Sequence, residues 1–150
     1  GVQIMFGIYE FQQLQSLLSD IYGGRRIDVR PFGYAFDFDS VAADGTVIAT
    51  QKIIGNADFI MCSASFSAFE PTIGFHTTLQ IEDSGSQERF FNQAVPVNMF
   101  ASTDSEQARG ITFPRRVAGN STLTATLTAG VLLTTPQLYL DGVHVFVYGN

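Results

Sequence analysis

The clearest pattern of apolar and polar positions lies in residues 122–128. Leu123, Ala125 and Leu127 alternate there with threonines at every other position. A period of two with β-branched residues on the polar side predicts an antiparallel strand with one buried face. Residues 118–121, Ala-Gly-Asn-Ser, precede this strand. They predict a turn, because glycine and asparagine adopt positive φ at low cost. The segment therefore predicts a corner followed by a half-buried strand.

Similar alternation recurs along the chain and predicts most of its other elements. Further strands are expected over residues 32–38, 45–54, 59–69, 75–83, 89–91, 94–100 and 137–148. Residues 31–54 predict a hairpin-like pair, and Asp141-Gly142 should bend or bulge the last strand. Short strands separated by turns are typical of an all-β fold. The prediction is an antiparallel β-sandwich of jelly-roll or immunoglobulin-like type over residues 25–150.

The same alternation assigns side chains to the core. In the strand over residues 59–69, one face is predicted to carry Ile60, Cys62, Ala64, Phe66 and Ala68. In the strand over residues 32–38, the aromatic face is predicted to carry Phe32, Tyr34, Phe36 and Phe38. Cys62 is the only cysteine, so no disulfide can form within the chain, and we expect a small buried hydrophobe rather than a reactive thiol.

The period changes near the N-terminus. Apolar residues recur at helical spacing from residue 9 to residue 22, which predicts an amphipathic helix of about three turns that Gly23-Gly24 ends. Residues 1–8 ahead of it are short and apolar. This unit, residues 1–24, either caps one end of the sandwich or forms an arm that binds a neighbouring subunit.

A basic patch follows the predicted helix. Arg25, Arg26 and Arg30 either line a solvated strand edge or pair with acidic groups of a neighbouring subunit. A sandwich of this size does not need another apolar segment, so we expect part of the N-terminal surface to be buried against another protein. The predicted interface residues are Val2, Ile4, Phe6, Phe11, Leu14, Leu18, Arg25, Arg26 and Arg30.

Composition narrows the classes of function. The 150 residues carry a net charge of −6, and such an acidic domain is poorly suited to binding nucleic acid. The chain has 14 phenylalanines and no tryptophan, which suits a dry sandwich core. Lys52 is the only lysine, and arginine favours ordered protein interfaces. Neither a signal-peptide pattern nor an apolar run of membrane-spanning length is present, so we expect no membrane partner.

The residues that carry chemistry elsewhere form no recognisable catalytic or metal motif. Asp37 and Asp39 share a strand face near Asp44, but the glycine and closing glutamate of an EF-hand are missing, so solvated carboxylates are favoured over a weak cation site. His76 and His144 are too few for a cupin metal centre. We therefore expect no enzymatic activity, no metal site and no cofactor.

The second half of the chain resembles a family of small virion proteins of tailed bacteriophages. The motifs that carry the resemblance are turn-and-strand patterns at residues 79–86, 90–97, 113–116, 118–124 and 142–149. They comprise a Leu-Gln-Ile-Glu-Asp-Ser-Gly-Ser strand and turn, a Phe-Asn-Gln-Ala-Val-Pro strand, a Phe-Pro-Arg-Arg corner, an Asn-Ser-Thr-Leu strand and a closing Gly-Val-His-Val-Phe-Val-Tyr-Gly strand. The resemblance covers roughly residues 30–149. The family looks like capsid auxiliary proteins, also called decoration or cement proteins.

This resemblance implies a non-enzymatic structural protein with a jelly-roll or immunoglobulin-like fold. The expected partners are the major capsid protein or other virion proteins, together with further copies of the chain in a homo-oligomer. The expected location is the exterior of the phage head, after synthesis in the bacterial cytoplasm. The alternative is a receptor- or carbohydrate-binding sandwich of a head spike, tail or fibre, which exposed clustered aromatics would favour.

Overall fold

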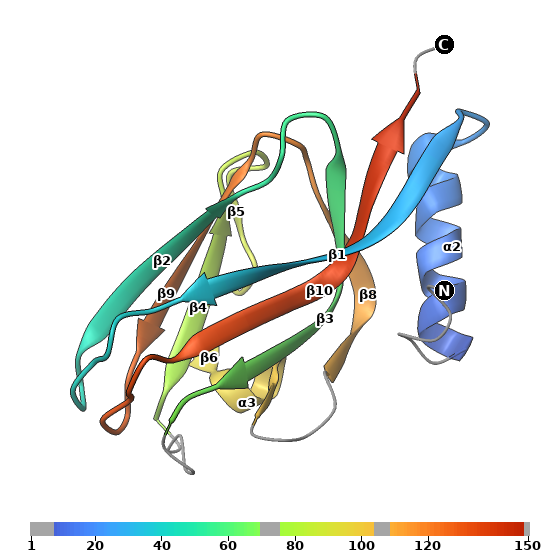
Figure 1. Ribbon diagram of the computed structural model, residues 1–150. Coiled ribbons are helices and arrows are strands. Elements are labelled where there is room, and N and C mark those ends of the chain that lie inside the picture. Colours follow the sequence, from blue (N-terminus) through green and yellow to red (C-terminus); the bar gives the residue numbers. More distant parts are fainter. Residues whose placement is uncertain (1–7, 70–75, 104–108, 149–150) are drawn as a thin grey trace.

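The computed structural model describes residues 8–69, 76–103 and 109–148, although it leaves the side chains of residues 8–11 and 109–113 undescribed. The chain is mostly β, with two sheets and two helices in the described part (Figure 1). The first sheet contains β1 (Ile27–Asp37), β10 (Gln137–Val147), β3 (Asp58–Ser67), β7 (Ser102–Thr103) and β8 (Arg109–Val117). The second contains β2 (Thr46–Lys52), β9 (Thr122–Thr128), β4 (Thr78–Asp83), β5 (Glu88–Arg89) and β6 (Val95–Pro96). The helices are α2 (Ile8–Tyr22) and α3 (Val97–Phe100).

Consecutive long strands lie in alternate sheets. Strands β1 and β3 belong to the first sheet, whereas β2 and β4 belong to the second. Pairing is antiparallel throughout except between β3 and the short strand β7. The expected hairpin over residues 31–54 is therefore wrong: β1 pairs with β10 and β2 pairs with β9. Because β1 and β2 each pair with a strand distant in sequence, local patterns could not reveal their partners.

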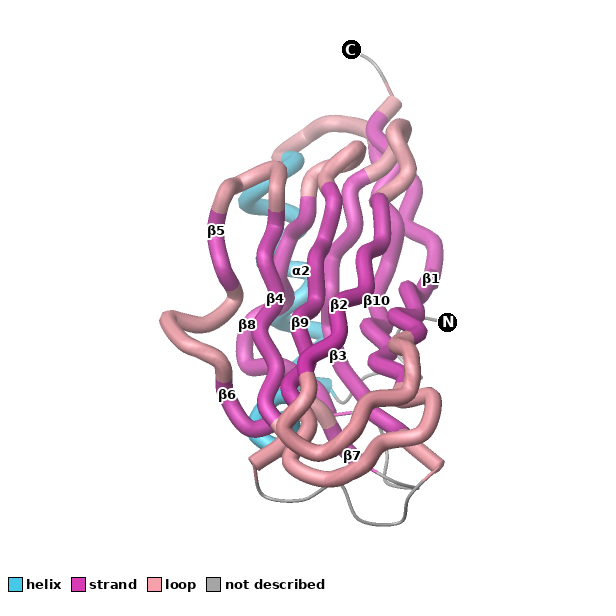
Figure 2. The backbone as a smooth tube through the Cα atoms, turned by 90° about the vertical axis from the view of Figure 1, so that its left-hand side faces the viewer, coloured by secondary structure: helices cyan, strands magenta, loops and turns pink. Residues whose placement is uncertain are grey.

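The main core lies between the two sheets. In β9, Leu123, Ala125 and Leu127 are fully buried while the threonines between them are half-buried, as the alternation predicted. Phe36 of β1 and Leu140 of β10 meet them from the first sheet, within the same buried cluster. Strand β9 lies between β2 and β4 in the second sheet (Figure 2). Its threonine side faces outward, because the opposite side carries the buried residues.

A β-bulge in β3 reverses the faces of that strand. Met61 is opposite Gly142 of β10, but Ser63 is opposite Asp141, so Cys62 is an extra residue between them. Phe59 and Met61 therefore face the core between the sheets before the bulge, and Ala64 and Phe66 face it afterwards. The expected single face from Ile60 to Phe66 is wrong for this reason. The irregularity expected at Asp141-Gly142 is confirmed.

Helix α2 covers the outer face of the first sheet. Leu14 packs there against Ile60, Cys62, Val143 and Val145, and Cys62 is buried as expected. Figure 1 shows the resulting order of layers, with the second sheet, the first sheet and α2 from left to right. The helix ends at Gly23, whose φ of 57° is the left-handed conformation common after a helix. The expected helix over residues 9–22 is confirmed within one residue.

The structure changes one further expectation in part. The segment over residues 94–100 was expected to be extended, but only β6 is a strand, and α3 makes one helical turn after Pro96. Proline can end the strand and begin the helix because its φ is fixed and its missing N–H is not needed at a helix start. Neither α2 nor α3, the helices of the described residues, is long and apolar enough to cross a bilayer.

Candidate functional site: an arginine–aromatic surface

One face of β1 and β10 carries alternating arginines and aromatic residues at the end nearest α2. Figure 1 shows these two strands continuing past β2 and β9, so the second sheet does not cover this part of the face. We call it the arginine–aromatic surface. It consists of Arg26, Asp28, Arg30 and Phe32 around β1 and of Phe146 and Tyr148 around the end of β10.

Cross-strand register places these side chains in contact. Asp28 is opposite Phe146, and the Tyr148 N–H donates to the Arg26 carbonyl oxygen at 2.9 Å. The Arg26 guanidinium lies over the Tyr148 ring at 5.4 Å, and the Arg30 guanidinium lies over the Phe146 ring at 5.0 Å. Both distances are typical of cation–π contacts, which hold each arginine at a fixed position on the sheet.

Asp28 connects the two arginine–aromatic pairs. Its Oδ2 accepts a hydrogen bond from Arg30 Nε at 2.7 Å and one from the Tyr148 hydroxyl at 3.4 Å. The ion pair is exposed to water, so its contribution to stability is small. Its structural effect is to hold the Arg30 fork beside the strand instead of leaving it free in solvent.

A histidine lies directly beneath this surface. The Phe32 ring stacks on His144 with a centroid separation of 4.1 Å, and the Tyr34 hydroxyl is 2.7 Å from His144 Nε2. His144 is only 4% exposed, whereas Phe32 is 45% exposed. Gly142 is opposite Phe32, and a Cβ at this position would clash with the Ile60 carbonyl group of β3, so the close approach of β3 requires glycine here.

Burial lowers the pKa of His144, because desolvation disfavours the imidazolium. The unfolded chain then binds the proton more tightly than the folded one. The stability that the neutral histidine contributes is complete above its ordinary pKa of about 6.5 and is lost as pH falls through the lower folded pKa. We therefore expect the melting temperature to fall between about pH 7 and about pH 5.

The His144→Gln variant isolates this effect. Its melting temperature should vary less over the same pH interval than that of the wild type. The exposed His76 offers a matched control, and His76→Gln should keep the wild-type dependence. A pH profile of thermal unfolding for the three proteins makes the measurement. Identical profiles for wild type and His144→Gln would contradict the assignment.

A second polar cluster ties α2 to the sheets. Asp58 Oδ2 accepts hydrogen bonds from the Tyr22 hydroxyl at 2.7 Å and from Arg116 Nε at 3.1 Å, and Oδ1 accepts one from the Gly119 N–H at 3.0 Å. Burial opposes ionisation of Asp58, but these donors outweigh it and lower its pKa. Burial and the neighbouring Asp58 raise the pKa of Tyr22 to about 12. An open pocket of 280 Å³ adjoins the cluster, lined by residues 55–58, Ala118, Gly119, Val145 and Val147.

The structure brings together only some of the residues that the sequence predicted as an interface. Arg26 and Arg30 belong to the arginine–aromatic surface, and Arg25 is exposed beside it. Leu14 is 1% exposed and is a core residue of this chain, so its side chain is not available to a partner. Leu18 is partly buried against the same cluster. The side chain of Phe11 and all of Val2, Ile4 and Phe6 lie outside the described residues.

Sequence reasoning missed the aromatic half of this surface. Phe32 was expected in the core because it shares a face with Phe36, and it does share that face. The second sheet ends before reaching Phe32, and no local pattern reports the length of the opposing sheet. The sequence did contain a signal for this surface in the last strand. Phe146 and Tyr148 alternate there with valines, so both faces of the strand are apolar and one of them is aromatic.

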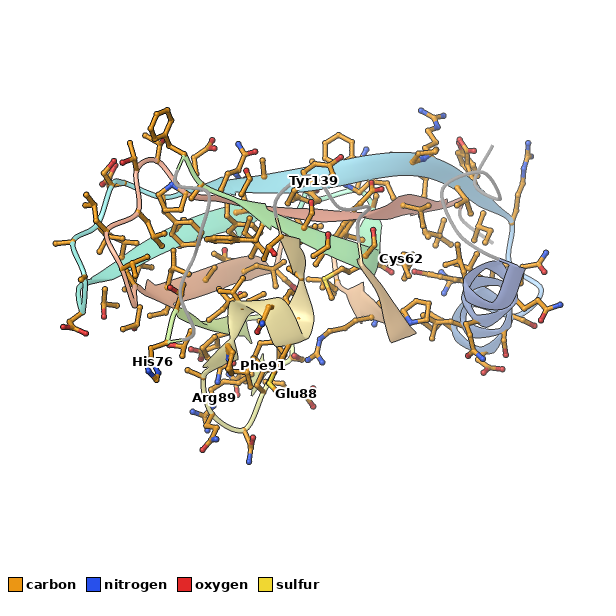
Figure 3. All side chains as sticks on the ribbon, turned by 90° about the horizontal axis from the view of Figure 1, so that it is seen from below. Cys62, His76, Glu88, Arg89, Phe91 and Tyr139 are labelled. Carbon is orange, nitrogen blue, oxygen red and sulfur yellow. The ribbon has the colours of Figure 1, made fainter. Side chains whose placement is uncertain are left out.

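The acidic residues considered for a cation site are not gathered into one. Asp37 Oδ1 accepts a hydrogen bond from Gln137 Nε2 at 2.6 Å at the end of β1, and Asp39 lies beyond that end. Within residues 8–69, 76–103 and 109–148, no group of three or more histidine, cysteine or acidic side chains is placed to hold a metal ion. Figure 3 shows His76, Glu88 and Arg89 on the side of the molecule opposite β1. His76 precedes the start of β4, whereas Glu88 and Arg89 pair with the end of that strand.

Comparison with known proteins places the chain in no family. No family model matches the sequence, and no curated protein matches it. Any functional assignment must therefore rest on the residues and on the geometry described above.

Proposed function

We propose that the chain is a structural virion protein of the capsid decoration type, which binds the outside of a phage head through the arginine–aromatic surface. The protein would act by mass action, because a protein that binds only the assembled shell stabilises that shell. The observation that carries the proposal is an exposed sheet face on which Arg26, Arg30, Phe32 and Tyr148 are held in place by contacts within the chain.

The composition of this surface supports protein binding. Arginine and aromatic residues are enriched in protein interfaces and among the residues that contribute most to affinity. The side chains of the surface are already ordered by ring and ion-pair contacts, so binding costs less conformational entropy. Arg25, Arg26 and Arg30 give this end of an otherwise acidic chain a local positive charge, which favours an acidic partner surface.

The strand order supports the proposed fold type. The order β1-β10-β3 with β8 faces the order β2-β9-β4-β5, and consecutive long strands alternate between the sheets. We infer a jelly roll rather than an immunoglobulin-like sandwich, because a jelly roll consists of two such interleaved sheets. Jelly rolls occur in viral capsid proteins, which agrees with the proposed role as an analogy of fold.

Carbohydrate binding is the alternative, and the geometry of the rings disfavours it. Sugars stack on free aromatic faces, whereas Arg30 lies over Phe146, Arg26 lies over Tyr148 and His144 stacks on Phe32. One face of each ring in the surface is therefore already in contact with this chain. A protein partner can still use the ring edges and the guanidinium forks.

The test is binding to heads purified from a phage that lacks this protein. Phe32→Ala is expected to weaken binding at least tenfold, which is about 1.4 kcal/mol or more, as for a central aromatic anchor. Arg89→Ala is the matched control, because Arg89 is exposed but lies on the opposite side of the molecule (Figure 3). Quantitative co-sedimentation makes the measurement, with thermal melts to verify that both variants are folded. Equal binding by wild type and a folded Phe32→Ala variant would overturn the proposed surface.

A further inference from the structure

Among the described residues, no strand pairs with the outer side of β2, which therefore forms an open edge of the second sheet. The Ala129 N–H donates to the Gly45 carbonyl oxygen and the Ile53 N–H to the Ser121 carbonyl oxygen, each at 2.9 Å. Because backbone groups alternate sides along an antiparallel strand, the odd-numbered residues of β2 bond to β9. The N–H and C=O groups that point away from the sheet are those of Thr46, Ile48, Thr50 and Lys52.

The corresponding edge of the first sheet is protected. In β1 the hydrogen bond from the Tyr148 N–H to the Arg26 carbonyl oxygen shows that the backbone N–H and C=O groups of even-numbered residues point toward β10. Pro31 therefore lies at an outward position, where it presents no N–H. The outward carbonyl of Ala35 accepts a hydrogen bond from Gln51 Nε2 at 2.7 Å. Proline and side-chain caps are devices that prevent pairing at a sheet edge.

Strand β2 has neither a proline nor, within the described part of the chain, a side-chain cap on its outward backbone groups. Its seven residues contain no proline, and its register with β9 is unbroken from Thr46 to Lys52. Ile48 lies at its centre and is 63% exposed, the only large apolar side chain on the outward face of this strand. An unprotected strand with exposed β-branched residues is a template for another strand.

We infer that this edge pairs with β2 of a second copy of the chain, forming an antiparallel two-fold dimer with a continuous sheet across it. A two-fold axis at Ala49 pairs Ile48 with Thr50 of the second copy and Thr46 with Lys52 of the second copy. This register gives every outward backbone group of β2 a partner. An axis at Ile48 or at Thr50 would leave some of those groups unpaired.

The side chains and charges are compatible with self-pairing. On the outward face Ile48 would lie beside a threonine, a favourable cross-strand pair of β-branched residues. Lys52 is the only charged residue of β2. The two lysines would lie six residues apart along the ribbon, about 20 Å at ~3.4 Å per residue, which is beyond the screening length of physiological salt. Like charges therefore do not oppose the pairing.

A proline substitution tests the inference. Thr50→Pro removes an N–H that points outward and that β9 does not use, as Pro31 does in β1. Sedimentation equilibrium should give twice the mass of one chain for the wild type and the mass of one chain for Thr50→Pro. Thr50→Val keeps the N–H and the side-chain shape and should remain dimeric. A monomeric wild type, or a dimeric and folded Thr50→Pro, would overturn the inference.

Cross-linking provides a second test that does not depend on the proline variant folding. Ala49→Cys places two thiols across the proposed two-fold axis, at a non-hydrogen-bonded pair where Cα atoms approach to about 4.5 Å, within disulfide range. Thr46→Cys is the control, since Thr46 is more exposed than Ala49 but would lie opposite Lys52. Oxidation should yield disulfide-linked dimers of Ala49→Cys in preference to Thr46→Cys. A higher yield of disulfide-linked dimers for Thr46→Cys than for Ala49→Cys would show that the thiols react by random collision of monomers, and it would overturn the proposed pairing.

The inference does not rest on the proposed function. The dimer edge at β2 and the arginine–aromatic surface at the ends of β1 and β10 involve different residues. Phe32→Ala should lose particle binding and remain dimeric, whereas Thr50→Pro should become monomeric and keep an intact arginine–aromatic surface. These outcomes distinguish failure of the proposed function from failure of the proposed dimer.

Discussion

Leu127→Ala is expected to lower the free energy of unfolding by about 2–5 kcal/mol, the range for a fully buried leucine that leaves a cavity. Leu127 is 0% exposed and lies in the core between the two sheets. It is opposite Val47 of β2 and Leu79 of β4, so the cavity would open in the middle of the second sheet. Close packing on all sides limits how far the neighbours can relax into the space.

Chemical denaturation of Leu127→Ala beside Thr126→Ala makes the measurement. Thr126 is the adjacent residue on the outward face of the same strand, and it is half-buried. Its replacement should cost about 1 kcal/mol or less, the span of strand preferences. Equal losses for the two variants would show that the inward and outward faces of β9 have been assigned incorrectly.

Asp58→Ala is expected to cost about 2–4 kcal/mol, because removing the carboxylate leaves buried donors without partners. The Tyr22 hydroxyl and the Gly119 N–H would each lose their acceptor. The bond to Arg116 should contribute less, since the arginine side chain is 44% exposed and water can replace its partner. The loss should be greatest in α2, which Tyr22 holds to the first sheet.

Asp28→Ala is the matched comparison for Asp58→Ala. Asp28 also pairs with an arginine and a tyrosine, but it does so at an exposed position. Its replacement should cost at most about 1 kcal/mol. Hydrogen exchange of the α2 amides should accelerate in Asp58→Ala and remain near wild type in Asp28→Ala. Unchanged protection of α2 in both variants would mean that Asp58 does not anchor the helix.

Elements with a strong local pattern could be predicted from the sequence. The alternation of leucine and threonine specified β9 and its two faces, and the helical spacing up to Gly23-Gly24 specified α2. These patterns are sufficient because each reflects one element with one buried side. The burial of Cys62 was predicted as well, although the reason differs, since it lies at a bulge beneath α2.

Features that depend on distant parts of the chain could not be predicted. The pairing of β1 with β10 is invisible in a local pattern, and the sequence instead suggested a hairpin with β2. The bulge at Cys62 changes which side chains of β3 face inward, although the composition on both sides of it is similarly apolar. Phe32 is exposed only because the second sheet stops short of it. Each outcome is decided by tertiary geometry that propensity does not contain.

The position of β10 has a consequence for how the chain reaches its native state. This strand lies between β1 and β3, and its Val147 pairs with Ile27 of β1, 120 positions earlier. During synthesis the first sheet cannot be completed until β10 has left the ribosome. Until then, the backbone N–H and C=O groups of β1 and β3 that bond to β10 in the native sheet have no partner strand. Helix α2 also lacks the valines of β10, which form part of the apolar surface that it covers. Such non-local topologies fold in milliseconds to seconds, and their open intermediates are prone to aggregate. Arg25, Arg26 and Arg30 lie near the start of β1, where their positive charge opposes non-specific strand association before β10 is in place.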